Sequence, residues 1–275
     1  MAIQFTEANH KYTSIDPTDL THWVSATSFI SLFKPKFDKE GIAAKVAKKR
    51  GSKWYGLAPE EIITIWEEEA TRATDLGTWY HNQRESELLA CRTIDRDGRQ
   101  IPIIAPHKDG ELKLASEQRL AEGVYPEHMI YLRSAGLCGQ ADRVEVIGNR
   151  IDLYDYKTNK EIKMKGFTTW DGITKKMLGP CAHLDDCNFN HYALQLSVYM
   201  YMMLKHNHFL DPGKLWIHHI VFEIEAEDEY GNPITKRDNN GDPVIKEVVP
   251  YEVPYLKSEV INMIKYVKDQ KLSYE

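Results

Sequence analysis

The spacing of apolar residues changes several times along the chain, and each change predicts a different element. Residues 3–13 and 21–25 alternate like short extended segments. Helical spacing follows, with helices expected to begin near Ser25, at Lys39 and at Pro59. The last of these starts with a proline and two glutamates, which is typical of a helix N-terminus because glutamates there oppose the positive end of the helix dipole. The front of the chain is therefore predicted to be largely helical.

The middle and the end of the chain alternate between strand and helix patterns. Strand-like alternation dominates residues 127–157, after a looser stretch that reaches about Ala115. A buried helix is predicted over 192–205, a strand over 215–224 and an amphipathic helix over 256–270. This order favours a single α/β domain over residues 1–275. Its three parts would be a helical N-terminal elaboration over 1–76, a core over 77–224, and a hairpin with a C-terminal helix over 225–275.

The composition is typical of a globular protein of the cytoplasm. Of the 275 residues, 42% are hydrophobic and 28% are charged, which excludes collagen-like, low-complexity and wholly disordered chains. Apolar runs are only a few residues long, against roughly 20 residues for a membrane-spanning helix, and the N-terminus does not predict a signal peptide. The four cysteines are too few for a disulfide scaffold and suit a reducing compartment. We therefore expect a soluble cytoplasmic protein without a membrane partner.

The distribution of charge says more about the partner than the net charge does. The 35 basic and 41 acidic residues give a net charge of −6, which alone disfavours a general binder of polyanions. Residues 34–53, however, hold eight lysines and arginines against two acidic residues, and residues 157–176 hold six lysines against two. Either run alone is more often a solvated helix face. Beside clustered carboxylates, the two runs would suit a groove that binds phosphates.

The strongest chemical signal comes from two strand-like runs that flank Gly148-Asn149. This dipeptide is typical of a two-residue hairpin loop. If it forms the loop, antiparallel pairing places Asp142 directly opposite Asp155. Lys157 lies two residues beyond Asp155 and therefore points to the same face of the strand. The hairpin would present two carboxylates and an ammonium group together at its open end.

Directly opposed carboxylates repel each other, because their Cβ atoms are roughly 5 Å apart. In a partly desolvated cleft the repulsion either raises one carboxyl pKa or requires a cation. Mg²⁺ prefers oxygen ligands and would supply the charge neutralisation and the activated water that phosphodiester hydrolysis needs. The alternative is a solvated hairpin end at which Lys157 pairs with Asp155, a common and weak arrangement. The position of Asp142 opposite Asp155 favours the metal site over this alternative. A register slip of one residue would turn Asp142 to the other face of the hairpin and remove this argument.

Four motifs along the chain, in the order Gly77-x-x-x-His81, Glu127, Asp142 with Asp155-Tyr156-Lys157, and Gln195-x-x-x-Tyr199, resemble those of the PD-(D/E)XK nuclease superfamily. Asp142 together with Asp155-Tyr156-Lys157 resembles its bipartite core, with Ala141 where the superfamily name has Pro. The other three motifs are Gly77-x-x-x-His81 before the core, Glu127 on the preceding strand, and Gln195-x-x-x-Tyr199 after the core. The set is most similar to the RecB-like exonuclease branch, which includes the CRISPR adaptation nucleases and the mitochondrial genome maintenance exonuclease.

The resemblance implies a fold and a function. The fold would be a restriction-endonuclease-like mixed β-sheet core flanked by helices. The function would be that of a Mg²⁺- or Mn²⁺-dependent deoxyribonuclease, of the exonuclease type, in recombination, repair or phage DNA processing. Its partner would be single-stranded DNA or the ends of double-stranded DNA, an oligomer is compatible with it, and a phage-encoded chain would act in the host cytoplasm. No iron–sulfur cluster is expected, because the four cysteines lack the C-terminal grouping of the members that hold one.

The resemblance also implies roles for individual residues. The metal would be bound by His81, Asp142, Asp155 and the carbonyl group of Tyr156. Glu127 would be a further catalytic carboxylate, and Lys157 would position the attacking water. Substrate contacts would come from Gln195, Tyr199, Tyr192 and Lys160. Bases would stack on Trp54, Tyr55 or Trp79, whose rings offer the flat surface that stacking needs.

Three alternatives stay open at this stage. His81 could pack against a core aromatic residue instead of binding a metal. The chain could be an inactive module that keeps the nuclease fold and binds nucleic acid or protein. Cys181, His183, Cys187 and His191 could form a zinc site, although their spacing departs from the usual one. Exonuclease and endonuclease action are both compatible with the motifs.

Overall fold

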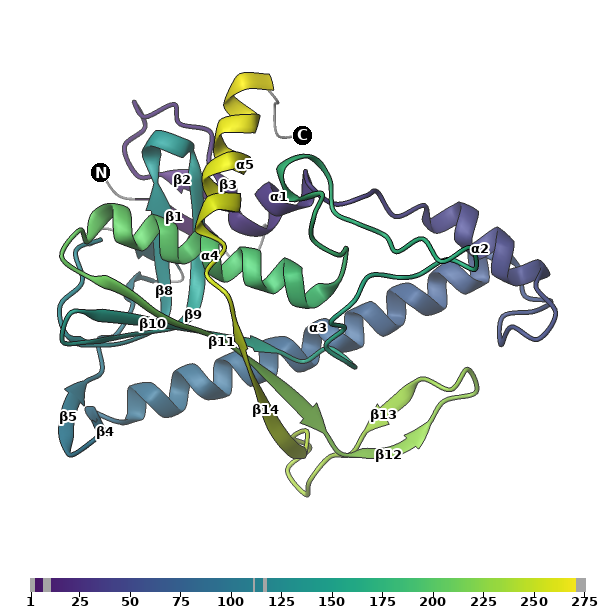
Figure 1. Cartoon of the computed structure of the whole chain (residues 1–275). Coiled ribbons are helices and arrows are strands. Elements are labelled where there is room, and N and C mark those ends of the chain that lie inside the picture. Colours follow the sequence, from purple (N-terminus) through teal and green to yellow (C-terminus); the bar gives the residue numbers. More distant parts are fainter. Residues whose placement is uncertain (1–2, 7–10, 111, 116–117, 271–275) are drawn as a thin grey trace.

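The computed structural model describes residues 3–6, 11–110, 112–115 and 118–270, which form a mixed α/β fold. Its centre is a six-stranded sheet with the order β14-β11-β10-β9-β3, in which β8 also pairs with β9 (Figure 1). The strands are β3 (Val24–Ser25), β8 (Gly123–Leu132), β9 (Leu137–Ile147), β10 (Arg150–Lys157), β11 (Asp211–Phe222) and β14 (Ile245–Val253). Pairing is parallel for β10 with β11 and for β3 with β9, and antiparallel for the other pairs.

The β9–β10 hairpin has the predicted loop and register. Antiparallel pairing extends from the loop to Tyr154 opposite Arg143, and Gly148 has a φ angle of +62° in the loop. Glycine adopts such an angle without steric cost, which favours the tight turn. The same register, continued by one residue, places Asp142 opposite Asp155. Val144, Val146, Ile151 and Leu153, which strand alternation places on one face of the hairpin, are all buried.

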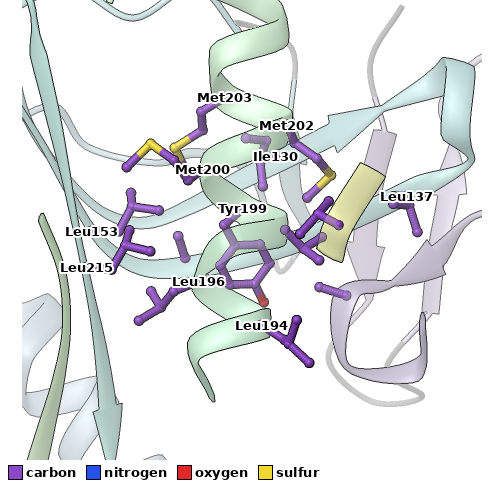
Figure 2. Close-up of a cluster of buried hydrophobic side chains, with 14 of the residues drawn as sticks. Ile130, Leu137, Leu153, Leu194, Leu196, Tyr199, Met200, Met202, Met203 and Leu215 are labelled. Atoms are coloured by element: carbon purple, nitrogen blue, oxygen red, sulfur yellow. The ribbon is translucent and has the colours of Figure 1, made fainter. Parts of the chain in front are cut away.

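Helix α4 (Asn188–His206) packs on this sheet and supplies much of the core. Its sequence is apolar on several faces, so its side chains meet those of the strands in one large cluster, part of which Figure 2 shows. Leu194 and Leu196 of α4 belong to this cluster together with Leu153 of β10 and Leu215 of β11. Each fully buried side chain of this size contributes about 1.5–3 kcal/mol. Helices α1 (Ala26–Ser31) and α5 (Lys257–Gln270) pack against α4 and complete the cluster.

Helix α3 (Pro59–Ala90) is one continuous helix of 32 residues, about 48 Å long, along the lower side of Figure 1. The expected boundary at residue 76 therefore lies within a single helix. Helix α2 (Lys39–Lys48) packs against the first turns of α3, where Ala43 and Ile62 are buried. In the described part of the chain, neither these helices nor any other is both long and apolar enough to cross a membrane.

Smaller sheets surround this centre. A four-stranded sheet contains β1 (Ile3–Thr6), β2 (Lys11–Ser14), β6 (His107–Asp109) and β7 (Leu112–Ala115). Two hairpins are formed by β4 (Thr93–Arg96) with β5 (Arg99–Pro102) and by β12 (Ile224–Glu227) with β13 (Pro233–Thr235). The expectation of looser structure up to Ala115 is wrong, because β7 is paired with β1 from the start of the chain. The extended segments expected over residues 3–13 and 21–25 are confirmed in the described residues by β1, β2 and β3.

Candidate active site

Four elements, α3, β8, β9 and β10, converge where the β9–β10 hairpin opens. Nδ1 of His81 on α3 lies 3.2 Å from Oε1 of Glu127 on β8 and 3.6 Å from Oδ1 of Asp142 on β9. One donor atom from each of these residues lies within 4.8 Å of the other two. Among the described residues, this is the one group of three or more His, Cys, Asp or Glu side chains that is compact enough to hold a metal ion.

Gly77 allows α3 to approach the sheet closely. A Cβ atom at this position would lie 3.3 Å from Oγ1 of Thr158, the residue after β10, which is tighter than most side-chain contacts. His81 follows one helical turn later and therefore lies on the same side of α3. Between them, the ring of Tyr80 packs edge-on against Tyr156 with a centroid distance of 5.3 Å. The Gly-x-x-x-His spacing thus corresponds to a close helix–sheet contact followed by a polar group at the site.

Glu127 occupies a strained position in β8. Its φ angle is +48° although it is not a glycine, and such conformations cost on the order of 1–3 kcal/mol. The pairing of β8 with β9 on either side of it places Glu127 opposite Asp142. The side chain is 6% exposed, forms a hydrogen bond with Nδ1 of His81 and accepts another from Nε2 of Gln140. These contacts hold the carboxylate at the centre of the group.

Asp155 and Lys157 form a buried ion pair at the end of β10. Nζ of Lys157 lies 2.6 Å from Oδ2 of Asp155, whose side chain is 2% exposed. Oδ2 of Asp142 accepts a hydrogen bond from the backbone N–H of Tyr156 at 2.6 Å, which ties β9 to β10 next to this pair. The three side chains that the sequence places at the open end of the hairpin do lie together. Asp155 is outside the compact group around His81, and its carboxylate faces Lys157 instead.

Asp142 and Asp155 hold their protons more tightly than usual, because their pKa values are raised. Burial, opposed by the charge of Lys157 and assisted by that of Asp142, raises the pKa of Asp155 to about 6. Burial also raises the pKa of Asp142, against the positive charges of His81 and Lys157. Carboxylates in such surroundings are stabilised in their charged form by an additional cation.

The two basic groups of the site shift in the direction that keeps them charged. Burial lowers the pKa of His81, but the negative charges of Asp142 and Glu127 outweigh it and raise this pKa to about 9. Burial also disfavours the ammonium form of Lys157, but Asp155 and Asp142 outweigh it and raise its pKa. Without a bound cation, both side chains therefore carry a proton near neutral pH.

The donor atoms of the site fit a hard divalent cation. Oδ2 of Asp155 is buried and lacks a hydrogen bond of good geometry despite its contact with Lys157, and Oε1 of Gln140 is also without a hydrogen-bond partner. Buried acceptors without donors are costly, and a cation relieves this cost. Carboxylate oxygens are the ligands that Mg²⁺ and Mn²⁺ prefer, and an imidazole nitrogen completes the set.

The Gln195–Tyr199 motif on α4 lies deeper than the resemblance implies. Tyr199 is 4% exposed and belongs to the core cluster of Figure 2. Its ring packs so closely on β9 that a Cβ atom at Gly139 would lie 2.5 Å from its Cε1 atom. Nε2 of Gln195 donates a hydrogen bond to the hydroxyl of Tyr199 at 3.2 Å. The expected direct substrate contact by Tyr199 therefore needs correction, since this side chain supports Gln195 from within the core.

Tyr192 and Lys160 lie on the open side of the site. The hydroxyl of Tyr192 donates to Oδ1 of Asn159 at 2.5 Å, and Nζ of Lys157 lies 4.8 Å from the centre of the Tyr192 ring. Lys160 is exposed and lines, with Thr158 and Asn159, a cavity of about 500 Å³. The other walls of this cavity come from α3, β11 and the β12–β13 hairpin. The cavity therefore begins directly after the residue that ends β10.

The residues of the zinc-site alternative do not converge. Cys181 and Cys187 are buried free thiols. His183 lies 3.2 Å from a glutamate of α5, and His191 lies 2.8 Å from Asp186. In the described part of the chain, these residues form no compact group of metal ligands.

Of the three aromatic residues expected to stack on bases, Trp54 is buried and Trp79 is partly buried. Trp54 is 9% exposed and stacks on Tyr230 with a centroid distance of 5.8 Å. The indole N–H of Trp79 donates to Oδ1 of Asp242 at 3.0 Å. Tyr55 is 53% exposed. The sequence could not show this, because the covering residues come from the distant segment around β13.

The sequence interpretation missed two polar residues of the site. Gln140 hydrogen-bonds to Glu127, and its position two residues before Asp142 on β9 places both on one face of the strand. Strand alternation is thus a signal that could have found it. Asn159, the partner of Tyr192, lies in a loop, where periodicity gives no such signal.

The site combines acidic oxygens and an imidazole that can hold a cation with an ammonium group that can stabilise negative charge. Neither a protein-family model nor a curated protein matches the chain. Its function is therefore inferred from the geometry of the site and from the order of its motifs.

Proposed function

We propose that the chain is a divalent-metal-dependent deoxyribonuclease of the PD-(D/E)XK type, with RecB-like exonucleases as its nearest resemblance. The observation that carries the proposal is the convergence of His81, Glu127 and Asp142 beside the Asp155–Lys157 ion pair. The mixed sheet, with α3 before and α4 after its central hairpin, supports a restriction-endonuclease-like core. The motifs thus stand both in family order along the chain and around one point in space.

Mg²⁺ or Mn²⁺ would be held by His81, Asp142 and Asp155, with Glu127 as the adjoining carboxylate and the Tyr156 carbonyl as a further ligand. When bound, the ion supplies an activated water and neutralises charge on the phosphate. His81 has to release its proton to become a ligand, because only the neutral imidazole coordinates a metal. The strained backbone of Glu127 and its hydrogen bonds fix its carboxylate before any ligand arrives.

Lys157 acts as a positive charge rather than as a base. Its raised pKa keeps the ammonium form at neutral pH, so it has no free electron pair with which to remove a proton from water. Negative charge increases on the phosphate oxygens during hydrolysis, and a preorganised ammonium group stabilises that charge. Asp155 holds the ammonium group in place through the contact of 2.6 Å.

DNA is the substrate that the surroundings favour. Residues 34–53 and 157–176 carry local excesses of positive charge, which suit a chain of phosphates. Lys160 lines the cavity next to the site, and Tyr192 and Gln195 are in place to contact the sugar-phosphate backbone. The alternative of an inactive binding module would share these surfaces and differ only in cleavage.

The proposal is tested with end-labelled linear, circular and single-stranded DNA, incubated with Mg²⁺, Mn²⁺ or EDTA. We expect cleavage with either ion and none with EDTA. Asp155→Asn should lower the cleavage rate at least about a hundredfold, because it removes a charge that holds both the ion and Lys157. Asp152→Asn is the matched control, since Asp152 lies on the opposite face of β10 and accepts hydrogen bonds from Arg150 and Lys214. Full activity of Asp155→Asn would overturn the proposal, and DNA binding without cleavage by the unaltered chain would favour the inactive module.

Lys157 gives a second test. Lys157→Ala should lower the cleavage rate at least about a hundredfold and leave DNA affinity within about threefold, because the lost charge acts mainly on the transition state. Lys214→Ala is the control, as Lys214 is half-exposed on neighbouring β11 and pairs with Glu252. Equal losses in both lysine variants would show a general electrostatic effect and contradict the role of Lys157.

A further inference from the structure

The segment between β10 and α4 contains a small, ordered hairpin over residues 166–175, which we call the 166–175 hairpin (teal-green in Figure 1). The backbone N–H of Lys175 donates to the carbonyl of Phe167 at 2.9 Å, and that of Thr169 donates to Ile173 at 2.9 Å. Gly172, with a φ angle of +82°, closes the turn. The tip is therefore held by hydrogen bonds and not by burial of its side chains.

Three large side chains of this hairpin are apolar and exposed to solvent. Trp170, at the tip, is 99% exposed, more than any other large hydrophobic side chain of the described residues. Phe167 is 67% exposed and Ile173 is 65% exposed. Single exposed apolar residues are ordinary, but several on one ordered projection mark a surface that a ligand covers.

The charge around these apolar residues selects the class of ligand. Residues 157–176 hold six lysines against two acidic residues. Lys165 directly precedes the hairpin, and Lys175 is its last residue. Aromatic rings interleaved with lysines are the combination that binds single-stranded nucleic acid, because bases stack on the rings while lysines meet the phosphates. A protein partner could bind through the apolar side chains alone, so the excess of positive charge favours nucleic acid.

The hairpin is fixed close to the candidate active site. The backbone N–H of Lys163 donates to Oδ1 of Asn188, the first residue of α4, at 2.7 Å, and that of Gly166 donates to Oδ2 of Asp185 at 3.1 Å. Gly166 lies nine positions after Lys157 in the sequence, so the base of the hairpin lies at most about 30 Å from the end of β10. A strand of DNA at the site can therefore extend to the hairpin over a few nucleotides.

We propose that the 166–175 hairpin is a base-stacking site for single-stranded DNA, with Trp170 as the stacking residue and Lys165 and Lys175 as phosphate contacts. The inference deepens the proposed function, on which it rests, by naming a single strand as the form of DNA that leads to the site. It also replaces buried Trp54 and partly buried Trp79 with an aromatic residue that the fold exposes.

The experiment compares binding of two fluorescent oligonucleotides of equal length, oligo-dT and an abasic strand, which carry the same phosphates but differ in bases. Anisotropy is measured in EDTA so that no cleavage occurs. The unaltered chain should bind oligo-dT at least about tenfold more tightly than the abasic strand. Trp170→Ala should remove this preference and leave affinity for the abasic strand unchanged, while Trp170→Phe should retain most of it.

The matched control is Phe209→Ala. Phe209 is also exposed, at 51%, but it follows the C-terminal end of α4, roughly 28 Å along the helix from Asn188. This variant should keep the full preference for oligo-dT. Lys165→Gln and Lys175→Gln should each weaken binding of both oligonucleotides by the same factor. Each should also reduce the salt dependence of binding by the amount expected for the loss of about one phosphate contact.

Three outcomes would overturn the inference. One is a Trp170→Ala variant that keeps the preference for oligo-dT, and another is equal weakening of both oligonucleotides by this substitution. The third is a loss of self-association in sedimentation, or of binding to anionic vesicles, without any change in oligonucleotide binding. Failure of the nuclease proposal is distinguishable, because a chain that never cleaves DNA can still show a base preference that depends on Trp170.

Discussion

Two equally buried carboxyl groups of this chain have pKa values that shift in different directions, because their neighbours differ. Glu145 and Asp155 are each 2% exposed, yet their pKa values shift in opposite directions. Burial alone would raise both, but the hydrogen bond from Arg96 and the charge of Arg143 lower the pKa of Glu145. Asp155 has one ammonium group nearby and a second carboxylate, so burial prevails. The first carboxylate stabilises the fold, and the second is available to a cation.

Glu145 carries the prediction at this scale. Glu145→Gln should lower the free energy of unfolding by about 2 kcal/mol near pH 7, because partly buried Arg96 and Arg143 lose their counter-charge. The folded-state pKa lies below the ordinary value of 4.5, so the stabilisation is present above that pH and is lost as the pH falls below it. Urea unfolding should therefore show a difference between the two chains that shrinks from about pH 5 downward.

The control for this prediction is Glu252→Gln. Glu252 is 51% exposed and pairs with Lys214 at the surface, so its loss should change the unfolding free energy by less than about 1 kcal/mol. A difference for Glu145→Gln that stays constant down to about pH 3 would contradict the assigned ion pairing.

Elements that depend on local chemistry could be predicted from the sequence, and elements that depend on distant partners could not. The register of β9 and β10 follows from the Gly148-Asn149 turn and from alternation, and both are local. Strands β6 and β7 were missed because they are only three and four residues long and depend on pairing, of β6 with β7 and of β7 with β1. The burial of Trp54 was missed for the same reason, since Tyr230 covers it from the far end of the chain. The exposure of Trp170 could not be predicted either, because a hydrophobic pattern does not show whether an apolar residue in a turn is exposed.

The contact between α4 and β9 gives the prediction at the scale of elements. Gly139→Ala should lower the free energy of unfolding by about 1–3 kcal/mol, because the added Cβ atom would lie 2.5 Å from the Tyr199 ring and force α4 away from the sheet. The same shift should slow DNA cleavage, since Gln195 moves with Tyr199. Tyr199→Leu removes the clashing ring atoms, so the double variant should be more stable than the sum of the single effects indicates. Strict additivity in chemical denaturation would contradict this contact.

At the scale of the whole molecule, helix α3 and the β12–β13 hairpin, which lie far apart in the sequence, form opposite parts of the wall of the cavity next to the site. Nζ of Lys53, after α2, donates to the carbonyl of Tyr230 at 2.5 Å and to Oδ1 of Asn232 at 3.2 Å. Arg72 of α3 lies 3.4 Å from Asp228 in the same hairpin. These contacts fix the β12–β13 hairpin against α3 and the segment after α2. Arg72 and Asp228 also line the cavity of about 500 Å³. The motifs thus supply the chemistry, while segments outside them determine how a substrate reaches it.

The proposed metal binding should be visible in the stability of the whole chain, because an ion that binds only the folded state stabilises it. At a Mn²⁺ concentration about a hundredfold above its Kd, we expect a gain of about 2.7 kcal/mol over the chain in EDTA, and a Tm increase of roughly 5–10 °C. Asp142→Asn should lose this increase, since Asp142 belongs to the compact group with His81 and Glu127. Asp152→Asn should keep it, because its carboxylate is bonded to Arg150 on the opposite face of β10. An equal increase in both variants would show that the ion binds elsewhere on the chain. No increase in the unaltered chain would contradict metal binding and show that Lys157 and His81 alone compensate the charge of the buried carboxylates.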